Sequence, residues 1–222
     1  DGSSSLGVKD FFEKTNRVKS RNWEDEFTLS HIDSNTNRVK KEISEDRPCP
    51  ICLSLKFKKV FKKQGFEHLK CIDCQTLYVS PSLTKKYFFK LWYGEDSPYP
   101  FLDVVNSETQ IKFDTERFNE TIEVIREIDS SLKSIFDVGT GGGLFIELSK
   151  NKGYVSRGID VYKRAVEFAN EKGRDVFLGD FVKSEINTKY DVVTLFEVID
   201  LIPDPLDVLE KAIKILNNNG LI

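Results

Sequence analysis

The alternation of apolar and polar residues becomes regular from about residue 106 onward. Isoleucine and phenylalanine recur at close to helical spacing through residues 111–128, which predicts a helix in front of a first strand. Four short apolar runs follow, separated by stretches of helical periodicity, and they predict strands at 134–138, 154–159, 175–178 and 190–196. Strands that alternate with helices at this interval predict right-handed βαβ units and a parallel sheet.

The last periodic stretch begins at Pro205, a residue that favours the first turn of a helix. We expect Asn217–Gly220 to end this helix before a further strand starts. Four apolar residues are expected to form its buried stripe: Leu206, Leu209, Ile213 and Leu216.

The predicted fold class is α/β, with a Rossmann-like, doubly wound and mostly parallel sheet of about five strands. An apolar strand is only beginning at Ile222, and the chain has no methionine, even at position 1. We therefore expect a fragment that is truncated before the last strands of the sheet.

Composition divides the chain into four segments. Residues 1–46 are mostly polar and predict a partly ordered extension, with at most a short helix around Val8–Lys19. Residues 47–80 contain all four cysteines, and residues 81–105 are an aromatic connecting segment. Residues 106–222 form the predicted cofactor-binding domain.

Hydrophobic residues at 39% and charged residues at 31% are typical of a globular protein. No apolar run approaches the ~20 residues of a membrane span, and no apolar signal-peptide core precedes the domain. These observations predict a cytoplasmic protein without a membrane partner. The charge is uneven, because residues 47–91 hold ten lysines and arginines against two acids.

The segment from Ile135 to Gly143, IFDVGTGGG, predicts a buried strand that runs into a glycine-rich loop opening a helix. Glycines can adopt positive φ, and they let a ligand lie against bare backbone. The dinucleotide fingerprint G-x-G-x-x-G would need its third glycine at Leu144. The pattern present is D-x-G-x-G-x-G, which resembles motif I of the class I S-adenosylmethionine-dependent methyltransferases.

Three acids lie at successive strand ends, where ligands bind in such a sheet. The resemblance implies that Asp137 orients the methionine amine and that Asp160, 21 residues after Gly139, binds both ribose hydroxyls. The resemblance also implies that Asp180 accepts a hydrogen bond from the exocyclic amine of adenine. A helix-capping carboxylate is the alternative role for each acid.

The full set of predicted cofactor-binding residues also includes the glycine loop and apolar walls. The set is Asp137, Gly139, Thr140, Gly141, Gly143, Asp160, Val161, Tyr162, Asp180, Phe181, Phe196 and Glu197. Phe196 and Glu197 would line the methionine and methyl end of the pocket.

The general base cannot be a histidine in this half of the chain. Asp200-Leu201 stands where similar enzymes often have Glu-His, and both histidines of the chain lie before the predicted domain. Glu197, Asp200, Tyr93 and Tyr99 are candidates for the base, and packing or surface exposure is the alternative role of each. No Asn/Asp-Pro-Pro-Tyr/Phe element follows the fourth strand, which argues against methylation of nucleobase amines in DNA.

The cysteines form two C-x-x-C pairs, Cys49/Cys52 and Cys71/Cys74, separated by eighteen residues. This spacing predicts a structural site in which four thiolates hold zinc. The segment between the pairs predicts a hairpin that turns at Gln64-Gly65 and includes His68. A pair of redox dithiols is the alternative, although disulfides are rare in a reducing cytosol.

A zinc ribbon followed by an aromatic linker and a methyltransferase domain resembles a bacterial group that acts on sugar nucleotides, surface polysaccharides and secondary metabolites. The resemblance covers residues 47–222 and implies methyl transfer from S-adenosylmethionine to a small molecule, possibly a sugar nucleotide or polysaccharide precursor.

Two other functions stay open. One is an RNA methyltransferase whose basic ribbon contacts RNA through Lys58, Lys59, Lys62 and Lys63. The other is a non-catalytic cofactor-binding or scaffold protein. The sequence predicts no oligomeric state.

Overall fold

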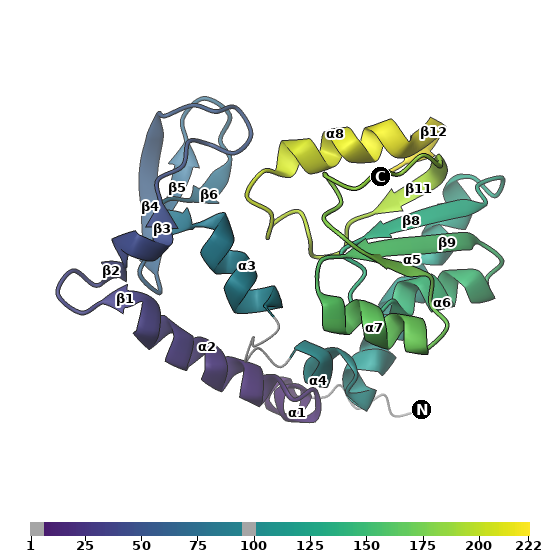
Figure 1. Cartoon of the computed structure of the whole chain (residues 1–222), viewed down its shortest axis with the longest axis horizontal. Helices are drawn as coiled ribbons and strands as arrows, with labels where there is room; N and C mark the ends of the chain where they lie inside the picture. Colours follow the sequence, from purple (N-terminus) through teal and green to yellow (C-terminus); the bar gives the residue numbers. More distant parts are fainter. Residues whose placement is uncertain (1–6, 95–100) are drawn as a thin grey trace. The chain divides into compact units, whose positions relative to one another are not determined.

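The computed structural model describes residues 7–94 and 101–222 (Figure 1). These residues divide into two compact units, which are described separately below. Unit 1 contains residues 7–20, 101–202 and 207–222, and unit 2 contains residues 21–94 and 203–206.

Unit 1 is built on a five-stranded, fully parallel sheet with the strand order β10-β9-β8-β11-β12. The strands are β8 (Ser134–Val138), β9 (Val155–Asp160), β10 (Val176–Leu178), β11 (Tyr190–Thr194) and β12 (Leu216–Leu221). The chain order reverses between β8 and β11, which is the switch point where such sheets bind ligands. The predicted Rossmann-like fold class is confirmed.

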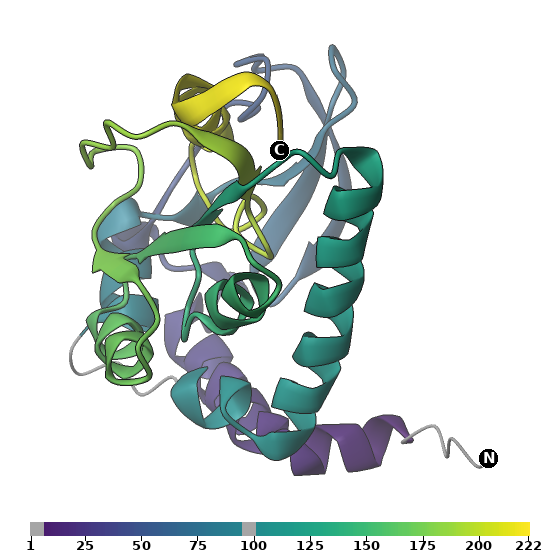
Figure 2. The ribbon, with the colours of Figure 1, turned by 90° about the vertical axis from the view of Figure 1, so that its right-hand side faces the viewer.

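Helices cover both faces of this sheet (Figure 2). Because side chains alternate along a strand, Ile135 of β8 packs on one face and Phe136 on the other. Ile135 meets α5 (Glu108–Ile128) and α6 (Leu144–Asn151). Phe136 meets α8 (Pro205–Ile215), and α7 (Lys163–Glu171) joins the face of α6. Two short helices complete the unit: α1 (Val8–Lys14) and α4 (Phe101–Val105).

The predicted stripe of the last helix is wrong for two of its four residues. In α8 the buried residues are Pro205, Val208, Ala212 and Ile215, whereas Leu206 and Ile213 are 37% and 62% exposed. Leu209 is half-buried, and Leu216, just after the helix, packs against the core. Both sets have helical spacing, so periodicity alone could not choose between them. The face with Ala212 allows a closer approach to the sheet. Asn217–Gly220 was also misassigned, since it lies in β12 rather than in a turn.

Unit 2 contains the predicted hairpin, which is confirmed. Strands β4 (Phe57–Lys63) and β5 (Phe66–Cys71) pair antiparallel, and Gln64 and Gly65 both have positive φ in the turn between them. β6 (Leu77–Val79) adds a third antiparallel strand.

Shorter elements surround this hairpin. They are α2 (Arg17–His31), which begins in unit 1, the strand pair β1 (Ile32–Asp33) and β2 (Arg38–Val39), the 3₁₀ turn η1 (Lys41–Ile43), the strand pair β3 (Ser44–Glu45) and β7 (Ser82–Leu83), and α3 (Lys85–Tyr93).

Residues 7–46 contain more regular structure than the sequence predicted. Helices α1 and α2 occupy most of 8–31, where at most one short helix was expected. The pattern was missed because α2 has few apolar residues and obtains its contacts from aromatic rings: Trp23 stacks on Phe27 at 5.5 Å and meets Trp92 of α3 at 4.9 Å. Among the described residues, no helix combines the length and apolarity that crossing a membrane requires.

Candidate functional site: the carboxyl edge of the sheet and the cysteine cluster

The glycine loop lies between β8 and α6, as predicted. Gly139, Gly141 and Gly143 all have positive φ, and Gly143 is the left-handed N-cap of α6. The N–H groups of Gly139 and Thr140 both donate to the carbonyl of Ile159, which fixes the loop against the end of β9. The loop therefore starts at the switch point, with a conformation that requires glycine.

Asp160 is the centre of this loop's hydrogen bonding. Its side chain is buried at the end of β9, where Oδ2 accepts from the Gly141 N–H and Oδ1 from the Tyr162 N–H, both at 2.8 Å. Burial raises the pKa of this carboxyl, and the two N–H donors oppose that shift. Each oxygen keeps a second lone pair, which can accept from a ligand hydroxyl.

Asp137 is buried beside it at the end of β8. Thr194, at the end of the neighbouring β11, donates its hydroxyl to Asp137 Oδ1 at 2.6 Å. Burial raises the pKa of Asp137 to about 7. The hydroxyl of Thr140 is also buried and lies close enough to lower that pKa slightly, but it forms no hydrogen bond of ordinary geometry with a described residue.

The glycines are needed by the chain itself, which the sequence did not predict. A Cβ on Gly139 would lie 2.3 Å from Cγ2 of Val198, and one on Gly141 would lie 3.0 Å from the ring of Phe101. Gly143 would meet Arg174 and Val176. The loop therefore packs against side chains of unit 1 in addition to any ligand it holds.

The structure places several predicted cofactor residues in the core. Phe181 stacks on Phe136 inside the sheet's core, with ring centroids 5.9 Å apart. Phe196 follows β11 and packs against Phe118 and Phe145 at 4.9 and 4.8 Å. Their side chains thus support the edge of the sheet from within.

Other predicted residues stay at the edge. Asp180 follows β10 and accepts from the Val182 N–H at 3.1 Å. Val161 is half-buried, and Tyr162 is buried with its ring 5.9 Å from that of Phe101. Asp137, Thr140, Asp160, Tyr162 and Phe101 lie together around the glycine loop at the carboxyl edge of the sheet.

The candidates for the general base are not brought together. Glu197 is exposed, has a φ of +53°, and forms an ion pair with Arg117 at 2.8 Å. Asp200 is exposed in the same loop. Tyr93 lies in α3 of unit 2, and Tyr99 lies outside the described residues.

Arg117 of α5 is a residue that the sequence analysis missed. Its guanidinium contacts Asp114 at 3.0 Å in addition to Glu197, and it lies 4.9 and 5.9 Å from the ring centroids of Phe118 and Phe196. It therefore connects α5 to the loop after β11. The i,i+3 spacing of Asp114 and Arg117 was the only signal in the sequence. Thr194 was detectable as the one polar residue inside the apolar run at residues 192–196.

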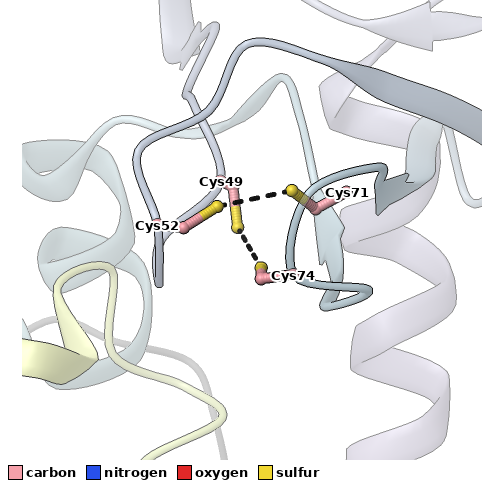
Figure 3. A group of neighbouring side chains, drawn as sticks. All are labelled: Cys49, Cys52, Cys71 and Cys74. Atoms are coloured by element: carbon pink, nitrogen blue, oxygen red, sulfur yellow. Dashed lines mark hydrogen bonds between the residues drawn. The ribbon is translucent and has the colours of Figure 1, made fainter.

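The four cysteines of unit 2 converge as predicted (Figure 3). Their sulfur atoms all lie within 4.8 Å of one another, with 3.4 Å between Cys49 and Cys74 and 3.5 Å between Cys52 and Cys71. A disulfide needs about 2.05 Å, so the cysteines are free thiols. Tetrahedral zinc with Zn–S bonds of about 2.3 Å separates sulfurs by about 3.8 Å, which this cluster fits.

Two matching turns hold these cysteines. In each, the first cysteine donates its N–H to the carbonyl five residues on, Ser54 or Thr76, and accepts from the N–H four residues on. The residue four positions after the first cysteine, Leu53 or Gln75, has positive φ. The Thr76 hydroxyl and N–H lower the pKa of Cys74 to about 6, whereas at Cys52 the Ser54 N–H is outweighed by hydrogen bonds with the neighbouring thiols and by burial, which raise the pKa to about 12. Of these two cysteines, Cys74 is the one shifted towards the thiolate that a metal binds.

Comparison with known proteins identifies the larger part of unit 1. Residues 111–222, half of the chain, match a family described as a methyltransferase domain, and the chain therefore belongs to that family. The resemblance carried by the D-x-G-x-G-x-G loop is thus confirmed. The match does not include residues 47–80, the segment with the four cysteines, which we call the cysteine module.

Curated relatives cover the same region. The ubiquinone biosynthesis O-methyltransferase of Nitrosomonas europaea is 30% identical over 114 residues, which are 48% of this chain and 48% of the relative. The mitochondrial enzyme of the same name from Schizosaccharomyces pombe is 31% identical over 140 residues, 59% of this chain and 48% of the relative. The chain spans about half the length of these relatives.

Among solved structures, this chain is similar to S-adenosylmethionine-bound CalS10, an amino pentose methyltransferase from Micromonospora echinaspora involved in calicheamicin biosynthesis. The match has a TM-score of 0.44 and 16% identity, and it covers 46% of each chain.

Proposed function

We propose that this protein transfers a methyl group from S-adenosylmethionine to a small-molecule acceptor. One observation carries the proposal: the buried carboxylate of Asp160, at the end of β9, is hydrogen-bonded to the glycine loop of a methyltransferase domain. Relatives named as O-methyltransferases favour a hydroxyl as the acceptor, and a sugar nucleotide or polysaccharide precursor is the finer candidate.

The cofactor would supply an electrophilic methyl carbon on a sulfonium, whose carbon–sulfur bond would break to release S-adenosylhomocysteine as the leaving group. The chain's own residues would bind and orient the cofactor. Asp160 would accept from the ribose hydroxyls, Asp137 would attract the methionine amine, and Asp180 would face the adenine amine. Such alignment in a site that excludes water contributes on the order of 7–11 kcal/mol to lowering the barrier.

We also propose that the cysteine cluster holds a structural zinc ion. Four protein ligands leave no open position for a water or substrate, so the metal would stabilise unit 2 rather than take part in the reaction. Residues 47–80 then form the zinc ribbon of the protein, and 106–222 its cofactor-binding domain.

The proposal is tested by incubating the zinc-loaded chain with S-adenosylmethionine labelled in the methyl group and separate panels of small phenols, nucleotide sugars and RNA. Label is expected in a small-molecule product. Label that appears only in RNA, or in no acceptor and no cofactor complex, would contradict the proposal.

Asp137→Asn is expected to stabilise unit 1 at pH 8 and to weaken cofactor binding. The carboxyl titrates near pH 7 when folded and near 3.8 when unfolded, so folding takes up a proton between those values. The penalty for ionising it develops as the pH rises from 4 to 7 and reaches on the order of 4 kcal/mol above pH 7. An amide avoids this penalty but loses the charge that would attract the methionine amine.

Urea unfolding followed by circular dichroism at pH 5 and pH 8 measures this effect. The variant should gain most stability over the unsubstituted protein at pH 8 and only about a third as much at pH 5, where the carboxyl is neutral in the folded state but already ionised in the unfolded state. Equal differences at the two pH values would show that Asp137 is not a buried carboxyl of raised pKa.

Arg117→Gln is expected to weaken S-adenosylmethionine binding about 2- to 5-fold, because Glu197 and Phe196 lose the group that holds them. An ion pair with an exposed partner such as Glu197 contributes about 0.2–1 kcal/mol. Arg126→Gln is the matched control, since Arg126 forms an i,i+3 ion pair with Glu123 on the same helix. Equal effects of the two substitutions on calorimetric affinity would exclude a role for Arg117 at the site.

A further inference from the structure

The three-stranded sheet of unit 2 has one face that carries the module's buried cluster and another whose Phe66, at the hairpin turn, lies 5.3 Å from the ring of His31. Leu69, Cys71 and Tyr78 are buried on the first face. Strand alternation and the observed register, with its bulge between Lys59 and Phe61, place another set of residues on the opposite side. We call this side the outer face; it carries Lys58, Phe61, Lys63, Phe66, His68, Lys70, Leu77 and Val79.

The outer face has positive charge without an acid on its strands. Lys58 of β4 lies directly opposite Lys70 of β5, and like charges in that position destabilise a sheet. The acid of the hairpin, Glu67, is on the other face, where it pairs with Lys59 at 2.6 Å and Arg38 at 2.9 Å. An anion bound between Lys58 and Lys70 would relieve their repulsion.

Aromatic rings lie next to these lysines. Phe61 is opposite His68 in the register, and their rings stack with centroids 4.1 Å apart and planes 18° from parallel. Phe61 remains 48% exposed, and Leu77, which lies opposite Lys70 in the register, is 54% exposed. Along β5, Lys70 and His68 are two residues apart, which corresponds to ~6.8 Å along the strand.

We propose that the outer face of β4–β6 binds single-stranded nucleic acid. Lysines would contact successive phosphates, and the exposed Phe61 ring would stack on a base, which is the combination that binds single strands without sequence preference. The cations and the ring extend along an open sheet face, which suits a polymer, whereas small molecules bind in concave sites. This activity goes beyond the proposed methyl transfer to a small molecule.

Fluorescence anisotropy of the zinc-loaded chain with a labelled 12-nucleotide oligo(U) RNA tests the proposal. Lys58→Gln with Lys70→Gln should weaken binding tenfold or more and reduce the slope of log affinity against log salt by ~1.4. Phe61→Leu should weaken binding roughly 5- to 150-fold. The matched control is Lys59→Gln with Lys62→Gln, which removes two lysines of the same strand on the other face. It should retain most of the affinity.

Three outcomes would overturn the proposal. They are no binding at low salt, equal losses in the test and control pairs, and competition by free UTP at the same affinity as the RNA, which would indicate a mononucleotide site. Tryptophan fluorescence confirms that each variant is folded, because both tryptophans, Trp23 and Trp92, lie in unit 2. A correctly folded Phe61→Leu variant with unchanged affinity would exclude stacking.

Discussion

Removal of zinc, by chelation or by Cys49→Ser, is expected to unfold the cysteine module while the parallel sheet of unit 1 remains folded. The module has little core of its own: its buried cluster consists of Cys49, Leu69, Cys71 and Tyr78, and two of these four are proposed metal ligands. No residue of β4 is buried. Structural zinc in small domains contributes about 10–16 kcal/mol of apparent binding free energy, which such a core cannot replace.

Tryptophan fluorescence and far-ultraviolet circular dichroism separate the two units. Fluorescence, which reports Trp23 and Trp92 of unit 2, should change on metal removal and recover when zinc is added. Most of the circular dichroism signal should persist. Leu55→Ser is the control, since Leu55 is exposed and three residues from Cys52. A metal-free protein with unchanged fluorescence and melting temperature would refute a structural zinc site.

Asp160→Ala should weaken S-adenosylmethionine binding by about 1–3 kcal/mol, which corresponds to roughly 5- to 150-fold in affinity. The substitution removes an acceptor for the ribose and releases the Gly141 N–H, so the glycine loop keeps its two bonds to the Ile159 carbonyl but loses its bond to the Asp160 side chain. Asp160→Asn, which keeps one carbonyl acceptor, should have an intermediate effect.

Asp175→Ala is the matched control for this change. Asp175 precedes β10 at the opposite edge of the same sheet and forms an ion pair with Arg157 at 2.7 Å. Calorimetry should show unchanged cofactor affinity in this variant. If Asp160→Ala, folded by circular dichroism, also binds as tightly as the original chain, the ribose is not bound at β9.

The sequence predicted the parts of the fold that local chemistry specifies. Glycines in D-x-G-x-G-x-G and an acid after each apolar run were enough to locate the carboxyl edge of the sheet. Gln64-Gly65 specified the hairpin turn through two residues of positive φ. The C-x-x-C pairs predicted the cysteine cluster because two cysteines with two residues between them can bind one metal ion from the same turn.

Contacts between distant residues were beyond such reasoning. The buried face of α8 depends on how closely Ala212 approaches the sheet, and helical periodicity allowed two answers. The sequence predicted Phe196 as a pocket residue, but its ring packs against Phe118 of α5 and Phe145 of α6. The packing of Val198 on Gly139, and the ion pair between Arg117 and Glu197 across 80 residues of chain, exist only in three dimensions.

The central claim is that the carboxyl edge of this sheet binds S-adenosylmethionine. Calorimetric titration of the zinc-loaded chain with S-adenosylmethionine at pH 8, beside an identical titration with NAD⁺, tests it most directly. The account predicts a single saturable site for S-adenosylmethionine and no heat with NAD⁺, since the third glycine is Gly143 and Leu144 stands where the dinucleotide fingerprint needs it. No binding of S-adenosylmethionine, or binding of NAD⁺ with equal affinity, would contradict it.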